Sequence, residues 1–320
     1  MRNKMRNKRP NFFIIGAAKS GTTTLYDYLD NHKNIYLSPI KEPNYFSSDI
    51  KVDQFSISYR NNTVLDTKSY FSNNDLPELQ VTFIRDFEEY KTLFKDVTDE
   101  LAIGEASTSY LYSGKAAQNI YEFNQGSKII AILRNPIERA FSHYLMALRY
   151  GFTHQNFRKA VESDINKNKK GWGISELFIE LGLYYQQLKR YYDIFPHNNI
   201  RIYLFEDLVK NPQFVINDCC KFLGVKSVNL HVKKHSNKAQ VPKMKFINTF
   251  ITKTGLKKMI LGLISSRQKE TLKQIAYSDD VPEISQKDAE FLESIFQDDI
   301  KKTSHLIGKD LGHWLLSEKM

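Results

Sequence analysis

The sequence predicts an α/β fold in which a central, mainly parallel β-sheet is flanked by helices. Short apolar runs, typical of buried strands, alternate along the chain with longer segments whose apolar residues recur at helical spacing. The run at 128–133, KIIAIL, shows no polar alternation, which is typical of a parallel strand covered on both faces. The chain shows no internal repeat and no clear linker. We therefore expect one domain over residues 1–320, with a flexible basic tail at 1–10.

The first half of the chain begins with a strand, a tight loop and a helix. Residues 12–16 are apolar, and Leu25, Tyr28, Leu29 and His32 follow at helical spacing. Further elements are expected as a strand at 35–37, a short helix at 87–94 and a strand at 101–103. Residues 47–85 are polar and rich in Asn, Ser and Asp, so they predict no regular structure.

The second half continues the alternation after the strand at 128–133. Pro136 fits the first turn of a helix, whose apolar face runs to Leu148 and whose expected stop is Gly151. The elements expected next are a long helix at 177–195, a strand at 200–205 and a helix from Pro212 to Gly224. The last third predicts helices that pack on the sheet.

Composition narrows the class of protein without choosing a function. The chain has 320 residues, with 41% hydrophobic and 26% charged residues, which is ordinary for a globular protein. Its net charge of +10 favours an anionic partner such as a nucleotide, an acidic glycan or a membrane surface. No stretch approaches the length of a membrane span, and no signal peptide is recognisable, so we expect a cytoplasmic protein.

Cysteines and histidines give no metal site in this sequence. Cys219 and Cys220 are adjacent, a spacing that rarely allows a disulfide, and we expect both to be reduced in a helix. His231 and His235 are four residues apart, but no glutamate lies between them as in a zinc-binding HExxH motif. We therefore expect no metal.

The strongest local signal is the segment at 16–24, GAAKSGTTT, which follows a strand and opens a helix. Backbone N–H groups at such a helix start attract an anion. Gly21 lets the backbone approach closely, and Ser20, Thr22 and Thr23 add hydroxyl donors. We expect a P-loop-like three-layer fold. In a Walker A motif a lysine follows the second glycine, but here that position is Thr22 and the lysine is Lys19. This departure favours a single 5′-phosphate-type group over a triphosphate.

A second anion site is expected where the strand at 128–133 ends. Ligands of open parallel sheets bind beyond the carboxyl ends of the strands, where Arg134 lies. Arg134 offers a bidentate fork for phosphate, and Ser142 in the following helix adds a hydroxyl. Arg139 either helps to bind the anion or pairs within the fold. Two such sites suggest a nucleotide with phosphates at both ends.

These motifs resemble those of the PAPS-dependent sulfotransferase family, where PAPS is 3′-phosphoadenosine 5′-phosphosulfate. AAKSGTTTL is similar to the family's 5′-phosphosulfate loop, and IIAILRNPIERAFSHY to its 3′-phosphate motif. Similarity continues in the block from Gly182 to Gln213, in FLGV and in LIGKDLGHWL. It is weakest over 47–100 and 245–280. The resemblance is to bacterial and glycan-type members, similar to heparan sulfate sulfotransferase domains.

The resemblance implies roles for residues at matching positions. The 5′-phosphosulfate would be held by Lys19, Ser20, Gly21, Thr22 and Thr23, and the 3′-phosphate by Arg134 and Ser142. Lys41 and Glu42 match a Lys-Glu pair that supplies the catalytic carboxylate in many glycan sulfotransferases. Asn237 and Lys238 lie where related enzymes close a loop over the cofactor. Apart from the resemblance, His32 is a second candidate base, although it lies on the apolar side of its helix and is expected to be packed there, and Glu105 is expected to orient acceptor or cofactor groups.

The resemblance further implies in-line transfer of a sulfuryl group from PAPS to a hydroxyl, with adenosine 3′,5′-bisphosphate as product and no metal. Lys19 would stabilise the charge on the bridging oxygen, and Glu42 would take the proton. The Lys-Glu pair favours a carbohydrate or glycolipid acceptor. The oligomeric state is not predicted.

Two alternatives remain open at this stage. One is a P-loop kinase that uses a nucleoside triphosphate. The other is a basic protein that binds a membrane or polyanion, because residues 238–269 hold many lysines among apolar side chains, as in an amphipathic surface helix. Peripheral membrane contact therefore stays open, and no nucleic-acid motif is present.

Overall fold

The computed structural model describes residues 9–72, 75–227, 240–257, 265, 268, 271–272 and 275–316. The chain divides into two compact units, each made of three segments. The first contains residues 1–49, 65–134 and 186–234, and the second contains 50–64, 135–185 and 235–320. The single domain expected over residues 1–320 stays a prediction.

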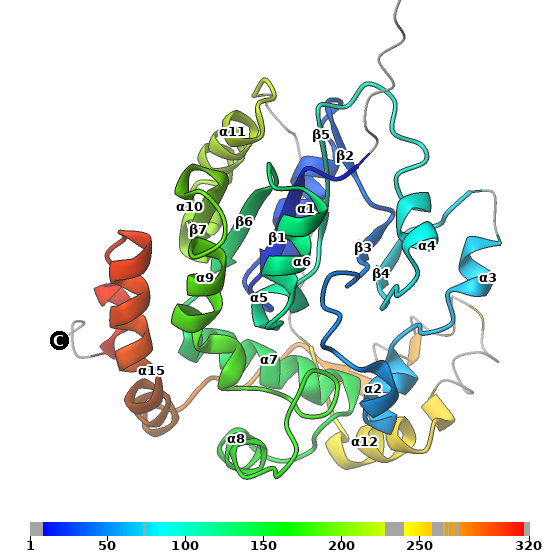
Figure 1. The fold of residues 1–320 in the computed structure, drawn as a ribbon. Helices are drawn as coiled ribbons and strands as arrows, with labels where there is room; N and C mark the ends of the chain where they lie inside the picture. The colour runs from blue at the N-terminus through cyan, green and yellow to red at the C-terminus, as the bar shows by residue number, and fades with distance from the viewer. Residues whose placement is uncertain are drawn as a thin grey trace, which may run out of the picture. The chain divides into compact units, whose positions relative to one another are not determined.

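A five-stranded parallel sheet forms the centre of the first unit (Figure 1). Its strands lie in the order β2-β5-β1-β6-β7, and all of the predicted strands are present. Their bounds are β1 Phe12–Gly16, β2 Ile35–Leu37, β5 Ala102–Ala106, β6 Lys128–Leu133 and β7 Ile200–Leu204. Every residue of β1 is buried, as the unbroken apolar run predicts for a strand covered on both faces.

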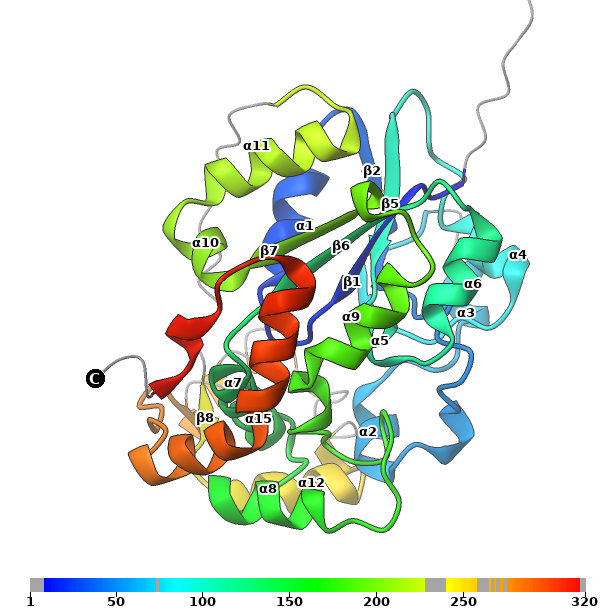
Figure 2. The ribbon, with the colours of Figure 1, turned by 60° about the vertical axis from the view of Figure 1, so that its left-hand side comes forward.

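Helices cover both faces of this sheet, which confirms the predicted three-layer α/β fold (Figure 2). One face carries α1 Thr22–Asp30, α10 Phe205–Lys210 and α11 Pro212–Leu223. The other carries α5 Ser109–Tyr112, α6 Ala116–Phe123 and α9 Tyr184–Tyr192, with the short 3₁₀ turn η3 His197–Asn199 before β7.

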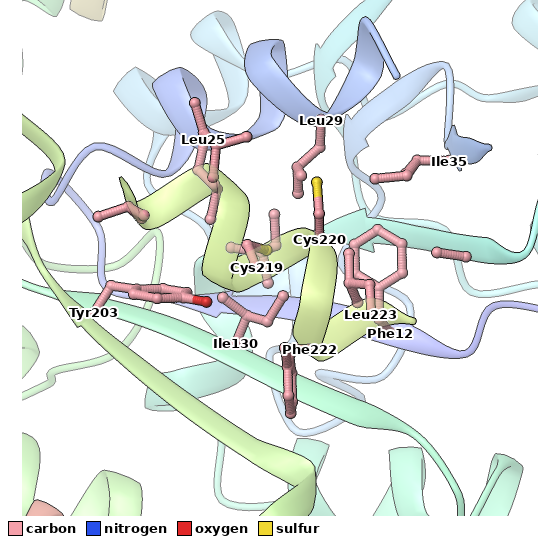
Figure 3. Close-up of a cluster of buried hydrophobic side chains, with 14 of the residues drawn as sticks. Phe12, Leu25, Leu29, Ile35, Ile130, Tyr203, Cys219, Cys220, Phe222 and Leu223 are labelled. Carbon is pink, nitrogen blue, oxygen red and sulfur yellow. The ribbon is translucent and has the colours of Figure 1, made fainter. Parts of the chain in front are cut away.

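The core between the sheet and α1 and α11 is apolar (Figure 3). Phe12 and Ile14 alternate along β1 and meet Leu25 and Leu29 of α1 in this cluster. Each such side chain contributes about 1.5–3 kcal/mol when fully buried. Cys219 and Cys220 lie in the same cluster as free, buried thiols, so the prediction of reduced cysteines in a helix is confirmed.

Residues 47–85, which predict no regular structure, contain short elements, so that prediction was wrong. These are η1 Val52–Gln54, α2 Ile57–Asn62, α3 Lys68–Phe71 and β4 Leu79–Val81, and β4 pairs in parallel with β3 Ile40–Glu42. Each element is too short for its apolar residues to show helical or strand periodicity. Side chains hold them instead: the Ser56 hydroxyl accepts from the Tyr59 N–H at 3.3 Å, and the Tyr70 hydroxyl donates to the Pro77 carbonyl at 2.8 Å. The helix predicted at 87–94 is α4, Phe87–Thr92.

The second unit is mainly helical. Its elements include α7 Pro136–Tyr150, α8 Phe157–Ile165, η2 Glu180–Gly182, α12 Lys245–Lys253, α15 Gln286–Ile307 and η4 Gly312–Trp314, with a short antiparallel ladder of β8 Val241–Pro242 and β9 Tyr277–Ser278. α7 has the predicted bounds, because the Asn135 side chain accepts from the Ile137 N–H and Gly151 takes the left-handed conformation at φ 77°. The helices expected in the last third are present, and their packing on the sheet stays a prediction. No helix among the described residues is long and apolar enough to cross a membrane.

The prediction of a long helix at 177–195 was wrong for its first part, because α9 begins only at Tyr184. Leu177 has the left-handed conformation, with φ 54°. The Asp164 carboxylate accepts from the N–H groups of Glu176 and Phe178 at 2.9 and 3.1 Å, which draws this backbone out of a helix. Tertiary contacts therefore override the helical spacing of the apolar residues.

Candidate active site

The loop between β1 and α1 begins at the carboxyl end of β1, in the middle of the sheet. Gly16 pairs with Ala131 of β6, and the Ala17 N–H donates to the Ile132 carbonyl at 2.8 Å. Lys19 and Gly21 both have the left-handed conformation, with φ 68° and 89°. The chain therefore turns tightly before α1 starts at Thr22.

Two glycines of this loop lie where a side chain would collide with its neighbours. A Cβ atom on Gly16 would lie 2.9 Å from the Leu111 Cβ atom. A Cβ atom on Gly21 would lie 3.0 Å from the Phe205 Cδ2 atom, on a backbone that L-residues rarely adopt. The loop is thus packed between α5 and α10, and its conformation depends on glycine.

The loop carries a buried hydroxyl group that is suited to a ligand. The Ser20 side chain is fully buried, and no group in the described part of the chain forms a hydrogen bond with its Oγ atom. Buried polar atoms normally have a partner. Gly21 is the N-cap of α1 and has no side chain to cap it, so the first N–H groups of α1 attract an anion. These features fit the predicted 5′-phosphate-type group.

Arg134, at the end of β6, lies next to this loop. Its guanidinium carbon is 4.6 Å from the centre of the Phe205 ring. The same ring leaves no room for a side chain at Gly21, so the Phe205 ring lies against both the loop and Arg134. The two predicted anion sites therefore lie at the same edge of the sheet, as expected for strand ends of a parallel sheet.

Glu42, at the end of β3, is held by its neighbours at a mostly buried position. Its Oε2 atom accepts from the Thr108 hydroxyl at 2.8 Å and from the Thr108 N–H at 3.3 Å. Its Oε1 atom lies 3.3 Å from the Lys41 ammonium nitrogen. The Glu42 and Lys41 side chains are 12% and 7% exposed. Lys41 therefore forms an ion pair with Glu42.

The segment that holds Glu42 is itself fixed to β1. The Ser107 N–H donates to the Ile14 carbonyl at 3.0 Å, and Leu111 packs on Gly16. Thr108 lies between these two anchors. The carboxylate of Glu42 is thus connected, through α5 and its first turn, to the strand end from which the phosphate loop leaves.

The turn after Glu42 is held by buried polar side chains. Asn44 has the left-handed conformation, with φ 52°, and its amide nitrogen donates to the carbonyls of Glu42 and Thr82 at 2.8 Å each. Its amide oxygen accepts from the Ser109 hydroxyl at 2.5 Å, and its N–H donates to the Ser107 hydroxyl at 3.0 Å. This network fixes the backbone that follows Glu42.

Glu105 on β5 lies beneath that network and is fully buried. Its carboxylate accepts from the hydroxyls of Tyr90 and Tyr110 at 2.8 Å each and from Ser107 at 2.7 Å. Burial raises the pKa of Glu105 to about 7, although the three hydroxyl donors oppose the rise, and the charge of Glu42 adds to it. Glu105 therefore orients the turn through Ser107 and Asn44.

His32 has the ordinary role of a buried histidine. Its Nδ1 atom accepts from the Asn34 N–H at 3.1 Å, so Nε2 carries the proton and donates to the Lys226 carbonyl at 2.8 Å. Both ring nitrogens are engaged in holding the backbone, so the suggestion that His32 is a second base is not supported by its surroundings.

Comparison with known proteins identifies the family. The sulfotransferase domain family matches residues 9–304. The chain is a member of this sulfotransferase family. Human carbohydrate sulfotransferase 15 is 23% identical over 251 residues, which cover 68% of this sulfotransferase and 44% of the human protein. Human heparan sulfate glucosamine 3-O-sulfotransferase 6 is 23% identical over 224 residues, which cover 70% and 54%. This sulfotransferase thus spans about half the length of these curated relatives.

A solved structure shows the same fold over nearly the whole sulfotransferase. The sulfotransferase from Alicyclobacillus acidocaldarius is 28% identical, with a TM-score of 0.67, and the match covers 96% of this chain and 98% of that one. The α/β fold and the membership of the sulfotransferase family expected from the sequence are therefore confirmed.

All residues expected in the cofactor and catalytic site stay predictions, and three of them lie outside the described part of the first unit. Ser142 lies half-buried in α7 and belongs to the second unit, whereas Arg134 belongs to the first. Asn237 and Lys238 lie outside the described residues, as do His231 and His235. Arg139 is fully buried in the second unit and donates to the Phe178 carbonyl, so it holds the fold around α7. Within the described ranges, no group of His, Cys, Asp and Glu side chains is placed to hold a metal ion.

Sequence reasoning missed the role of Phe205, which was expected only as the end of the strand at 200–205. Its place directly after β7, at the same edge as Arg134, was the available signal. The network around Asn44 gave no local signal, because its partners Thr82 and Ser109 lie 38 and 65 positions away in the chain.

Proposed function

We propose that this sulfotransferase transfers the sulfuryl group of PAPS to a hydroxyl group of a carbohydrate or glycolipid. The observation that carries the proposal is the position of Phe205, which is in contact with both Gly21 of the phosphate loop and Arg134. Two anion-binding elements at one sheet edge suit a nucleotide that is charged at both ends. The family supports this donor.

The predicted binding residues fall into two groups, one for each charged end of the nucleotide. Ser20, Thr22, Thr23 and the N–H groups of α1 would hold the 5′-phosphosulfate, because a buried hydroxyl and a helix start both favour an anion. Arg134 would hold the 3′-phosphate, with Ser142 as a second donor and Asn237 and Lys238 closing over the nucleotide. The adenosine 3′,5′-bisphosphate product would occupy the same groups.

The transfer itself needs a base and a charge-stabilising group. The acceptor oxygen forms a bond to sulfur, the bond from sulfur to the bridging oxygen breaks, and the electron pair of that bond leaves on the phosphate. The acceptor proton passes to the Glu42 carboxylate, which Thr108 and Lys41 hold in place. Lys19 would stabilise the charge that develops on the bridging oxygen. Positioning and charge provide the catalysis, and no metal is required.

A glycan acceptor is supported by the relatives, whose names include carbohydrate and heparan sulfate glucosamine sulfotransferases. The position of sulfation is a separate question, which an acceptor screen would answer. The cytoplasmic location expected from the sequence stays a prediction.

The proposal is tested first by binding and then by transfer. Calorimetry should show tight binding of adenosine 3′,5′-bisphosphate without added metal, and weak binding of ATP with magnesium. The reverse preference would favour a kinase. Transfer of labelled sulfuryl from PAPS should then be measured with a panel of glycans, glycolipids, simple alcohols and tyrosine peptides. No transfer to any glycan or glycolipid, together with transfer to another hydroxyl class, would refute the acceptor assignment alone.

A further inference from the structure

Helix α12 of the second unit presents its apolar side chains outward and its polar side chains inward. Phe246, Ile247 and Phe250 are 67%, 50% and 55% exposed. Asn248, Thr249 and Thr252 on the same helix are 7%, 3% and 1% exposed. A surface helix of a globular protein normally shows the opposite arrangement, with the apolar stripe toward the core.

The outward side chains form one continuous face. Successive residues of an α-helix are rotated by about 100°, so Phe246, Phe250 and Ile247 fall within an arc of about 100°. Lys253 lies at the C-terminal end of this arc, and Met244, which is 67% exposed, precedes the helix. We call Phe246, Ile247 and Phe250 the apolar face of α12.

Polar contacts of the inner side fix this orientation against α7 and α2, which lie beside α12 (Figure 1). The Asn248 amide donates to the carbonyls of Leu148 and Arg149 at 2.8 and 3.2 Å. The Asn61 amide of α2 donates to the Thr252 carbonyl at 3.0 Å. Rolling α12 to bury its apolar face would break these hydrogen bonds, so the face stays outward.

The stretch of sequence that contains α12 is basic. The sequence contains no Asp or Glu between Asp218 and Glu270. Lys243 and Lys253 are exposed and Lys245 is half-buried at the two ends of α12. A short helix with exposed aromatic and aliphatic side chains and flanking lysines is the pattern of a helix that lies in a membrane interface.

We propose that the apolar face of α12 docks this protein onto an anionic lipid bilayer. The phenylalanine rings and Ile247 would enter the boundary between headgroups and acyl chains, and the lysines would contact the negative headgroups. The absence of acidic residues from this stretch of sequence favours an anionic surface as the occupant. The contact is peripheral and independent of the sulfuryl-transfer site.

The test is co-sedimentation of the full chain with vesicles, one set of phosphatidylcholine alone and one with about one third phosphatidylserine. The wild type should sediment with the anionic vesicles, and added salt should weaken the binding. The double variant Phe246→Gln, Phe250→Gln should partition at least about ten-fold less. Phe214→Gln is the matched control, because Phe214 of α11 is also 67% exposed, and it should bind as the wild type does.

Charge variants test the second half of the proposal. Replacing Lys243 and Lys253 with Gln should reduce binding by about five-fold for each charge removed. Lys159→Gln, an exposed lysine on α8, should have no effect. All altered side chains are exposed, and thermal unfolding would confirm that the variants keep the wild-type fold.

Three results would overturn the proposal. The first is a wild type that binds neither kind of vesicle. The second is a Phe246, Phe250 variant that binds as tightly as the wild type. The third is a wild-type dimer in analytical ultracentrifugation that this variant converts to monomers without any vesicle binding, because the face would then be an interface between two copies.

Discussion

The loop between β1 and α1 and the hydrogen-bond network around Glu42 lie near the same sheet edge but are built in different ways. The loop is one contiguous segment, and the features that suit it to an anion are backbone N–H groups, two glycines and Ser20. The Glu42 network is assembled from β3, β5 and the residues between β5 and α5, and its geometry depends on side chains that hold one another. We therefore expect the loss of one side chain to disturb the Glu42 network more than the loop.

The largest effect is expected from Glu42→Gln, which removes the base but preserves the shape. Transfer should fall by about 10²–10⁴-fold. Binding of adenosine 3′,5′-bisphosphate should remain close to that of the wild type, because the phosphate loop is unchanged. Single-turnover rates with PAPS and calorimetry give the two quantities. Near-normal turnover with the true acceptor would show that another group takes the proton.

Lys19→Ala should lower transfer by about 10²–10³-fold, because it removes a positive charge from where the bridging oxygen becomes negative. Lys33→Ala, which alters an exposed lysine just beyond α1, is the control and should be neutral. Comparing kcat with KM shows whether the charge acts in the transition state. If only KM changes in the variant, Lys19 contributes to substrate binding and does not stabilise the transition state.

Glu105→Gln should change how stability depends on pH. The folded-state pKa of Glu105 lies near 7, above the ordinary value of 4.5, so between these values the folded protein holds a proton that the unfolded chain has lost. The stability that this carboxyl contributes is therefore present below pH 4.5 and is lost as pH rises through 7. Between pH 4.5 and pH 7, the free energy of unfolding of the wild type should fall by on the order of 3 kcal/mol more than that of the Gln variant.

Urea unfolding at pH 5 and pH 8 measures this difference. The exposed Glu283 provides the matched control, since Glu283→Gln should keep the wild-type slope. Burial also raises the pKa of Glu176 to about 7, so part of the slope should persist in the Glu105 variant. Equal slopes in the wild type and Glu105→Gln would mean that the Glu105 carboxyl is ionised throughout.

The smallest effect on stability is expected from Ser20→Ala. Because the Ser20 hydroxyl has no hydrogen-bond partner within the described residues, its loss should be neutral or slightly stabilising. Ser113→Ala is the contrast, because the Ser113 hydroxyl is buried and donates to Asp49, and its loss should cost about 1 kcal/mol. Affinity for adenosine 3′,5′-bisphosphate should show the opposite order, with Ser20→Ala weakened by about ten-fold. Thermal unfolding measures the stability of the two variants, and calorimetry measures their affinity for the bisphosphate.

The sequence predicted the sheet and the tight loop after β1 because both depend on local patterns. An unbroken apolar run indicates a buried strand, and glycines between a strand and a helix indicate a tight turn at the helix start. The Lys41 and Glu42 positions came from resemblance, since spacing alone does not distinguish a base from a surface acid.

Contacts between distant residues could not be predicted in this way. Asn44 is held in its turn by Ser109 and Thr82, and Phe205 lies against both Arg134 and Gly21 of the loop. The same limit explains the error at 177–183, where the carboxylate of Asp164 outweighs an apparent helical period. The spacing of apolar residues indicates which side chains are buried. It does not indicate which backbone N–H groups form hydrogen bonds with side chains that are distant in the sequence.

The central claim is that the loop after β1 and Arg134 together hold one nucleotide with charge at both ends. Calorimetric titration of the wild type and Arg134→Ala with adenosine 3′,5′-bisphosphate and with adenosine 5′-phosphate tests it most directly. We predict that the wild type prefers the bisphosphate, and that Arg134→Ala loses about 10–100-fold of affinity for it while binding the monophosphate nearly unchanged. Equal affinity of the wild type for the two nucleotides, or an equal loss of both in the variant, would contradict the account.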